Sequence, residues 1–378
     1  MIDLTIYIAI GLTLIYVGIM FFYSYNWRRL PVFEPSTNTS TLNKVSISVL
    51  IAARNEELNI VKCLESLFEQ NYTGDWEVIV IDDSSTDKTW SILQALSQRF
   101  PKLILLKNKG EGKKSALTTG IASAKGEWIV TTDADCLFQT EWLTLIGECV
   151  SQSNIQCIAA PVAFYNDKNN LEHFQTLDFC GMMGITGAGI YTRLMRMGNG
   201  ANLAYRKSVF LEVNGFEGIM THASGDDMLL MHKIAQRYPL GITFIKHFGA
   251  TVFTLPISDW KGFVRQRVRW ASKSKGYSEW QVTLILAMVY FFSCSILFTA
   301  LFSWISIKIF EVLIIQLIVK ITIDYYFLKP LATFFKRNDL MRPVTFVIST
   351  VLHLVYIIAI GTYANLVKNY QWKDRLVK

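Results

Sequence analysis

The sequence predicts an α/β domain built on a parallel β-sheet and joined to apolar helices that are long enough to span a membrane. In the middle of the chain, apolar strand-like runs alternate with helical patterns, and uncharged stretches of 24 to 28 positions lie on both sides. The composition is 51% apolar and 18% charged, against about 25% charged in an average soluble domain. This composition excludes a disordered chain, a collagen-like fibre and a disulfide-rich secreted module.

The uncharged stretches are long enough for membrane spans, because a helix needs about 20 apolar residues to cross the hydrocarbon core. They are Leu4–Trp27, Trp280–Ile307 and Pro343–Val367. Buried core helices are the alternative, but the aromatic and basic residues at their ends favour spans. A fourth apolar stretch, Val312–Leu328, contains Lys320 and Asp324. We interpret it either as a further span or as a re-entrant segment.

The basic residues predict which side of the membrane the central domain faces. Arg28 and Arg29 follow the first stretch, and five Lys and Arg residues between 265 and 275 precede the second. Because cytoplasmic flanks are enriched in Lys and Arg, the domain is expected in the cytoplasm. The tail is also basic. Either the 312–328 segment is re-entrant, which gives three spans and a cytoplasmic tail, or the chain has four spans and a tail on the outside that overrides the rule. We expect a multi-pass integral protein of the inner or plasma membrane, with the first stretch retained as an anchor.

The expected organisation follows from these changes in composition along the chain. The predicted parts are an anchor at 1–27, a polar linker at 28–44, an α/β domain at 45–256, an amphipathic interfacial segment at 257–279, a membrane region of two or three spans at 280–367 and a basic tail at 368–378.

Within the α/β domain, periodicity predicts strands over 45–53, 76–81, 103–106 and 128–132, and helices over 55–70, 87–100 and 113–124. A Ser or Thr is expected to cap the helix at 87–100. Strands that alternate with helices and read as continuous apolar runs predict a parallel sheet that is covered on both faces. Ligands of such sheets bind beyond the carboxyl ends of the strands.

Acidic residues follow two of these strands. Asp82 and Asp83 come after the second strand, where such residues are usually turn or cap residues but can also accept hydrogen bonds from a nucleobase. Asp133 and Asp135 follow the fourth strand. They form either a solvated turn or a site for Mg²⁺ or Mn²⁺, which take carboxylate and phosphate oxygens as ligands.

Further candidates lie outside the strands, and each has a structural alternative. Asp226 and Asp227 begin a predicted helix, where acids also suit the helix dipole. Lys113, at another helix start, either reaches a phosphate or is solvated. Gln266, Arg269 and Trp270 precede the second span and belong either to an interfacial helix or to a diphosphate and sugar site. Similarly, the glycine-rich segment Leu171–Met197 is either an acceptor wall or ordinary packing.

Together, these ordered motifs resemble the membrane-anchored branch of the family-2 glycosyltransferases, which are inverting enzymes with the GT-A fold. The resemblance extends from about Val45 to Tyr277. It rests on Asn55-Glu56 after the first strand, Asp82-Asp83-Ser84-Ser85-Thr86-Asp87, Gly112-Lys113 with Ala116-Leu117, Asp133-Ala134-Asp135, Asp226-Asp227, and the Q-x-x-R-W motif of Gln266, Arg269 and Trp270.

The resemblance implies a role for each matched residue. Asp227 would be the catalytic base, with Asp226 supporting it, and Asp133 and Asp135 would hold the metal. Asp83 would meet the uracil of the donor. The remaining donor-binding residues would be Asn55, Glu56, Lys113, Asp133, Gln266, Arg269 and Trp270.

The predicted activity is the transfer of a sugar from a nucleotide diphosphate, expected to be a UDP-sugar, to a lipid or lipid-linked glycan acceptor at the membrane. A processive polysaccharide synthase of the same family is the alternative, and a catalytically silent nucleotide-sugar-binding protein is a more distant one. No nucleic-acid partner is expected, since the net charge of +7 includes no dense basic block.

Overall fold

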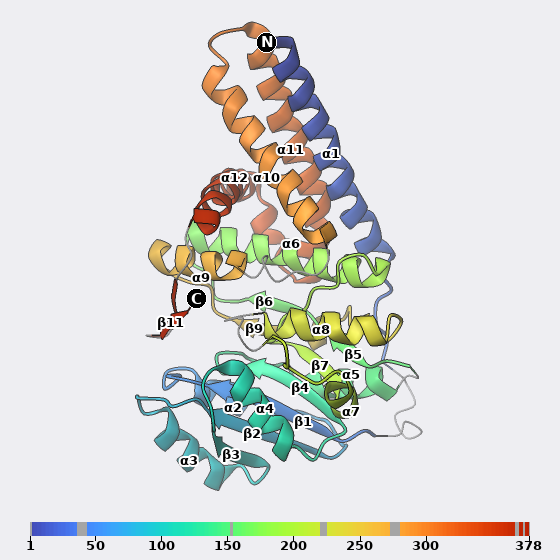
Figure 1. Ribbon diagram of the computed structural model, residues 1–378, viewed down its shortest axis with the longest axis vertical. Helices are drawn as coiled ribbons and strands as arrows, with labels where there is room; N and C mark the ends of the chain where they lie inside the picture. Colours follow the sequence, from blue (N-terminus) through green and yellow to red (C-terminus); the bar gives the residue numbers. More distant parts are fainter. Residues whose placement is uncertain are drawn as a thin grey trace. The chain divides into compact units, whose positions relative to one another are not determined.

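The computed structural model describes residues 2–35, 44–151, 154–219, 225–272, 280–366, 370–372 and 375–377 (Figure 1). Residues 36–43 of the predicted linker and part of the basic tail lie outside the described residues, as do Lys273 and Lys275. The chain forms two compact units. The sheet unit comprises Pro31–Tyr165 and Arg196–Leu255, and the helical unit comprises Met1–Leu30, Asn166–Met195 and Pro256–Lys378. Residues 166–195, which the sequence analysis placed inside the α/β domain, therefore group with the apolar helices.

A mixed seven-stranded sheet with the order β3-β2-β1-β4-β7-β5-β8 forms the centre of the sheet unit. Its strands are β1 (Ile47–Ala53), β2 (Trp76–Asp82), β3 (Leu103–Lys107), β4 (Trp128–Asp133), β5 (Cys157–Ala159), β7 (Leu203–Arg206) and β8 (Ile242–Phe244). The predicted parallel pairing is confirmed for β1 to β4, whereas β7 runs antiparallel to both β4 and β5. A second, two-stranded sheet pairs β6 (Val162–Phe164) with β9 (Val252–Thr254), and another pairs β10 (Tyr370–Trp372) with β11 (Arg375–Val377).

The strands are buried because their side chains are apolar along almost their whole length. In β1, for example, Ile47, Val49, Leu50 and Ile51 are all 0% exposed. Such continuous burial is expected of strands that are covered on both faces.

Helices connect the strands of this unit. They are α2 (Ile60–Phe68), α3 (Thr89–Arg99), α4 (Lys113–Ser123), α5 (Trp142–Ser151), α7 (Lys207–Glu212), α8 (Asp226–Arg237) and the 3₁₀ turn η2 (Phe248–Ala250). The helix predicted from residue 55 begins only at Ile60, because Asn55 has a left-handed backbone (φ 53°) that interrupts a helix. The predicted Ser or Thr cap of α3 is wrong: the Asp87 carboxylate accepts the Thr89 N–H at 2.9 Å.

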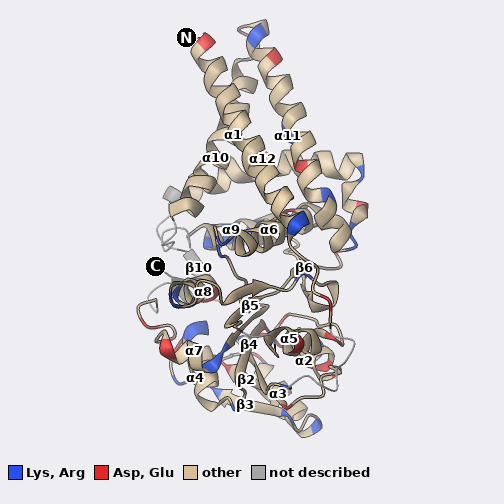
Figure 2. Cartoon of the chain, turned by 90° about the vertical axis from the view of Figure 1, so that its right-hand side faces the viewer, with Lys and Arg blue, Asp and Glu red and all other residues tan. Residues whose placement is uncertain are grey.

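The helical unit consists of α1 (Ile2–Arg29), α6 (Asn170–Thr192), α9 (Trp260–Ser272), α10 (Trp280–Phe302), α11 (Ile307–Phe334), η4 (Asn338–Met341) and α12 (Pro343–Leu366). Among the described residues, three helices are long and apolar enough to cross a membrane: Ile2–Arg29, Trp280–Phe302 and Pro343–Ala364. Helices α1, α10 and α11 lie side by side (Figure 1). Figure 2 shows few charged residues along α1 and α10.

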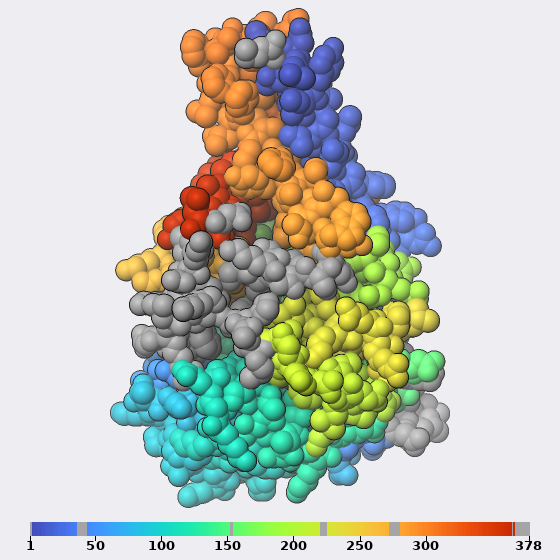
Figure 3. Space-filling model, in the orientation of Figure 1, coloured from blue at the N-terminus to red at the C-terminus, as the bar shows by residue number. Residues whose placement is uncertain are grey.

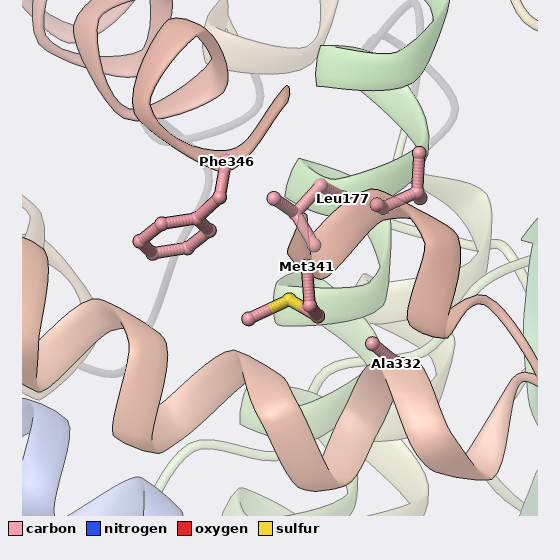
Figure 4. Close-up of a cluster of buried hydrophobic side chains, with 5 residues drawn as sticks. Leu177, Ala332, Met341 and Phe346 are labelled. Atoms are coloured by element: carbon pink, nitrogen blue, oxygen red, sulfur yellow. The ribbon is translucent and has the colours of Figure 1, made fainter. Parts of the chain in front are cut away.

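A cluster of buried apolar side chains connects α6 with the C-terminal helices of this unit (Figure 4). Its members are Leu177 on α6, Ala332 on α11, Leu340 and Met341 on η4, and Phe346 on α12. The glycines of α6 let side chains of neighbouring helices approach its backbone closely. A Cβ at Gly184 would lie 2.6 Å from the Leu331 side chain, and one at Gly187 would lie 2.8 Å from Trp27. These contacts favour the packing interpretation of the glycine-rich segment over an acceptor wall.

Candidate active site

The sheet brings the ends of β1, β2 and β4 to one edge. In the register of the parallel strands, Ala53 pairs with Asp82 and Ala52 pairs with Asp133. The residues that follow these strands therefore gather beyond the same carboxyl edge, which is where α/β sheets bind ligands.

Asn55 joins the loop after β1 to the loop after β2. Its side-chain oxygen accepts the Thr86 N–H at 2.8 Å, and its own N–H donates to the Ser85 hydroxyl at 3.1 Å. The N–H of Glu56 similarly donates to the Thr89 hydroxyl at 2.7 Å. The polar residues of both motifs thus fix the two loops against each other.

Asp83 holds the loop that leads into α4. It is 3% exposed, and its carboxylate accepts from the Asn108 amide at 2.6 Å and from the Gly112 N–H at 3.1 Å. Gly112 has φ 87°, a conformation that glycine adopts readily, and Lys113 follows it as the first residue of α4. The placement of Asp83 consequently helps to set the position of Lys113.

Lys113 connects the D-x-D loop to the acid pair of α8. Its ammonium lies 2.6 Å from the Asp133 carboxylate and 3.8 Å from that of Asp226. Burial lowers the pKa of Lys113, but the negative charges of Asp133 and Asp226 outweigh this and leave it raised. The side chain is therefore a fixed positive charge between the two acidic motifs.

Asp227 lies in the first turn of α8 and is oriented by two backbone groups. One carboxylate oxygen accepts the Gly200 N–H at 2.9 Å and the other accepts the Met228 N–H at 2.8 Å. Gly225, just before the helix, has φ 88°. Residues 220–224, which precede Gly225, lie outside the described residues.

Asp133 and Asp135 meet the chemical requirements of a divalent cation. The Asp133 side chain is 42% exposed, and Asp135 accepts the Thr254 hydroxyl at 3.2 Å. Burial, followed by the negative charges of Asp133 and Glu56, raises the pKa of Asp135 to about 6. No group of three or more His, Cys, Asp or Glu residues suited to a metal occurs in the described part of the chain. Two carboxylates nevertheless fit Mg²⁺ or Mn²⁺, because phosphate and water oxygens complete their coordination shells.

The Q-x-x-R-W residues lie on α9 and belong to the helical unit, whereas the other predicted site residues belong to the sheet unit. Gln266, Arg269 and Trp270 are all partly exposed. The amide oxygen of Gln266 is buried and has no hydrogen-bond partner among the described residues. The ring of Trp270 lies 6.0 Å from that of Phe179 on α6.

The sequence analysis missed residues that support this site. Gly200 approaches it so closely that a Cβ there would lie 3.1 Å from the Lys113 ammonium. Asn202 is 1% exposed and accepts from the Trp142 indole N–H at 3.0 Å. The repeated Gly and Asn of residues 198–202 were a visible signal of an unusual turn, but nothing local connected that turn to Asp227.

A separate pocket of 540 Å³ lies between α4 and the segment after α7. Figure 3 shows the surfaces of these two elements next to each other. Its described lining includes Thr118, Phe210, Phe216 and Glu217 and none of the predicted site residues.

Comparison with known proteins identifies a family domain within the chain. Residues 48–213 match the model of "Glycosyl transferase family 2". The chain is 29% identical over 280 residues to the probable glycosyltransferase YdaM of Bacillus subtilis, an alignment that covers 69% of this chain and 64% of the relative. It is also 34% identical over 128 residues to a beta-monoglucosyldiacylglycerol synthase of Nostoc, covering 33% and 27% of the two chains. The matched regions thus span less than two thirds of these relatives.

A solved structure shares the fold. It is the mannosyltransferase PcManGT of Pyrobaculum calidifontis in complex with GDP-Man and Mn²⁺, with a TM-score of 0.64, 20% identity, and coverage of 93% of this chain and 99% of that one. The fold is therefore the GT-A fold accompanied by apolar helices, and residues 48–213 of the chain form a family-2 glycosyltransferase domain.

Proposed function

We propose that the protein transfers a sugar from a nucleotide diphosphate, most simply UDP, to a lipid or lipid-linked acceptor at a membrane. The observation that carries this proposal is the position of Lys113, 2.6 Å from Asp133 of the D-x-D motif and 3.8 Å from Asp226 of the acid pair. In this proposal, Asp133 and Asp135 serve the leaving diphosphate, and the acid pair of Asp226 and Asp227 serves the acceptor.

In the proposed reaction, Asp227 is the general base. The acceptor hydroxyl loses its proton to the Asp227 carboxylate while its oxygen attacks the anomeric carbon. The bond from that carbon to the diphosphate breaks, and the nucleoside diphosphate leaves. Because this single displacement uses no enzyme nucleophile, the configuration at the anomeric carbon is inverted.

The departing diphosphate needs positive charge. Asp133 and Asp135 would hold Mg²⁺ or Mn²⁺, which, when bound, neutralises charge on phosphate oxygens. Lys113 remains protonated and supplies a second positive charge from the start of α4. The structural neighbour PcManGT was solved with GDP-Man and Mn²⁺, which supports the proposal of a divalent cation beside a nucleotide sugar.

The membrane placement is also proposed. Arg28 and Arg29 end α1, and by the positive-inside rule they support a cytoplasmic position for the sheet unit. In α11, Lys320 and Asp324 are buried and paired at 2.6 Å, and Asp324 also accepts the hydroxyl of Tyr16 on α1. Such pairing reduces the cost of charged groups in a bilayer. We infer that α11 crosses the membrane beside α1 and α10.

A single transfer is favoured over processive synthesis because few candidate spans accompany the domain. Among the relatives are a glycolipid synthase and a chondroitin synthase, so the assay needs to separate the two products. Purified protein is incubated with a panel of UDP- and GDP-sugars, with and without lipid extract. We expect nucleotide release that depends on one donor and on lipid, and a product that is soluble in organic solvent. A long polymer would support the alternative of a processive polysaccharide synthase. If no donor releases its nucleotide, the alternative of a catalytically silent nucleotide-sugar-binding protein would be supported.

A test of which side of the membrane the sheet unit faces needs introduced cysteines. The native Cys63 and Cys157 are both 0% exposed and are therefore poor labelling sites. The exposed positions Gln98 on α3 and Ile305 between α10 and α11 are suitable. A membrane-impermeant thiol reagent applied to intact cells should label Ile305→Cys, and should label Gln98→Cys only after lysis. Labelling of Gln98→Cys in intact cells would contradict the cytoplasmic placement.

A further inference from the structure

Arg267 lies within the Q-x-x-R-W segment but does not belong to its pattern, and the helical unit buries it completely. Its side chain is 0% exposed, and one guanidinium nitrogen lies 3.1 Å from the Asp178 carboxylate on α6. The two groups are not in hydrogen-bonding geometry, so the attraction between them is one of charge rather than of a directed bond.

Aromatic rings surround the same guanidinium. Its carbon lies 4.3 Å from the centre of the Trp270 ring, 5.2 Å from that of Phe263 and 5.5 Å from that of Tyr356 on α12. Cations are attracted to ring faces at these distances. Another guanidinium nitrogen lies 3.8 Å from the Met182 sulfur on α6. Arg267 thus contacts α6 and α12 as well as its own helix.

Helix geometry relates the position of Arg267 to the positions of the Q-x-x-R-W residues. Residues three and four apart share one helix face, so Gln266, Arg269 and Trp270 form a stripe along α9. Successive residues are about 100° apart around a helix, so Arg267 lies beside this stripe and next to Trp270, whose ring its guanidinium contacts. The burial agrees: Phe263, Arg267 and Val268 are at most 5% exposed, whereas the three residues of the stripe are partly exposed.

We propose that Arg267 is a positioning residue: by anchoring α9 to Asp178 on α6, it fixes the rotation of α9 about its axis and so the direction in which Gln266, Arg269 and Trp270 point. This inference rests on the proposed donor-binding role of those three residues. The first arginine of the segment orients the helix, and the second contacts the donor.

The experiment separates positioning from stability. Arg267→Met alone would leave the buried Asp178 carboxylate without a compensating charge, which is strongly destabilising. The double variant Asp178→Asn with Arg267→Met removes both charges and keeps similar volumes, a change that is often tolerated. Arg265→Met is the matched control, because Arg265 is an exposed arginine on the same helix. All variants are assayed in detergent, which removes any contribution from anionic lipid.

We expect the double variant to keep a thermal midpoint within about 3 °C of the wild type. Its kcat/KM for the nucleotide sugar should nevertheless fall by about tenfold or more, chiefly through a higher KM. Arg265→Met should stay within about twofold of the wild type in both measurements. A double variant with wild-type kcat/KM would overturn the inference.

Two further variants complete the test. Arg269→Met should lose activity; if it keeps wild-type kcat/KM, the donor role of the stripe is wrong and the positioning role fails with it. If Arg269→Met is inactive while the double variant is fully active, only the positioning role fails. If the double variant does not fold, Arg267→Lys decides, because it keeps the charge but loses the planar stacking surface. A folded Arg267→Lys with several-fold lower kcat/KM supports the inference, and one with wild-type kcat/KM contradicts it.

Discussion

The sheet unit and the helical unit hold their charged groups in different ways. In the sheet unit, Lys113 and Asp133 keep part of their side chains in solvent, 25% and 42% exposed, at the open edge of the sheet. In the helical unit, the pairs Arg267–Asp178 and Lys320–Asp324 are almost completely buried. Exposed charges can exchange partners when a charged ligand arrives, whereas buried pairs resist separation. In the proposed reaction, the partly exposed charges of the sheet unit act on the substrates, whereas the buried pairs of the helical unit hold its own helices together.

A large loss of activity is expected when the D-x-D motif of Asp133 and Asp135 is changed. Asp135→Ala should lose divalent-dependent binding of the nucleotide sugar, and turnover should fall by about 10²–10³-fold, since charge stabilisation of the leaving group is removed. Titration of the nucleotide sugar at increasing Mn²⁺ measures the binding. Glu69→Ala, which changes an exposed acid at the end of α2, is the control. Full activity of the wild type in excess chelator would show that no metal takes part.

A variant of Lys113 tests whether this partly exposed lysine acts on the donor. Lys113→Met should lower kcat/KM by roughly tenfold to a hundredfold, because hydrogen bonds to charged groups contribute about 1.5–3 kcal/mol. Steady-state kinetics with the preferred donor provides the measurement. Lys109→Met removes an exposed lysine four residues earlier and should have little effect. Equal rates for the two variants would mean that Lys113 only balances the charge of Asp133.

A smaller effect is expected at the start of α3, where Asp87 is a structural residue of the sheet unit. Asp87→Ala should lower the free energy of unfolding by about 1 kcal/mol, the usual value of a helix cap. Burial raises the pKa of Asp87, but its hydrogen bonds with Thr89 outweigh this and leave it lowered. A lowered pKa stabilises the fold above the unfolded value of about 3.9, and this contribution is lost as the pH falls through the folded pKa.

Denaturant unfolding at several pH values tests whether the stabilisation by Asp87 is lost as the pH falls. The difference between wild type and Asp87→Ala should be constant near neutral pH and shrink below about pH 4. Gln94→Ala, at an exposed position of the same helix, should change stability little at any pH. A difference that grows on acidification would show that the Asp87 carboxylate does not stabilise the helix.

The two units also differ in how far the sequence predicts them. In the sheet unit, the four parallel strands and the acids after them were predicted, because strand runs and the motifs that follow are contiguous in sequence. The antiparallel strand β7 was not assigned, since a four-residue strand has too few positions to show periodicity.

In the helical unit, the uncharged helices were predicted from length and composition, but their partners were not. Asp178 and Arg267 are 89 positions apart, and no local pattern connects them. The same holds for Tyr16, whose hydroxyl donates to Asp324 on another helix. Long-range pairs of this kind depend on how helices pack, which periodicity does not specify.

The proposed role of Asp227 is to remove the proton from the acceptor, while the other residues of the candidate site bind the donor. It is tested most directly by measuring, on the same preparation of Asp227→Asn, donor binding by calorimetry and sugar transfer into the lipid phase. Asn is close in size to Asp but is not a base, so donor affinity should change little while transfer falls by about 10²–10⁴-fold. Transfer above about a tenth of the wild-type rate, with donor affinity unchanged, would contradict the assignment of Asp227 as the base.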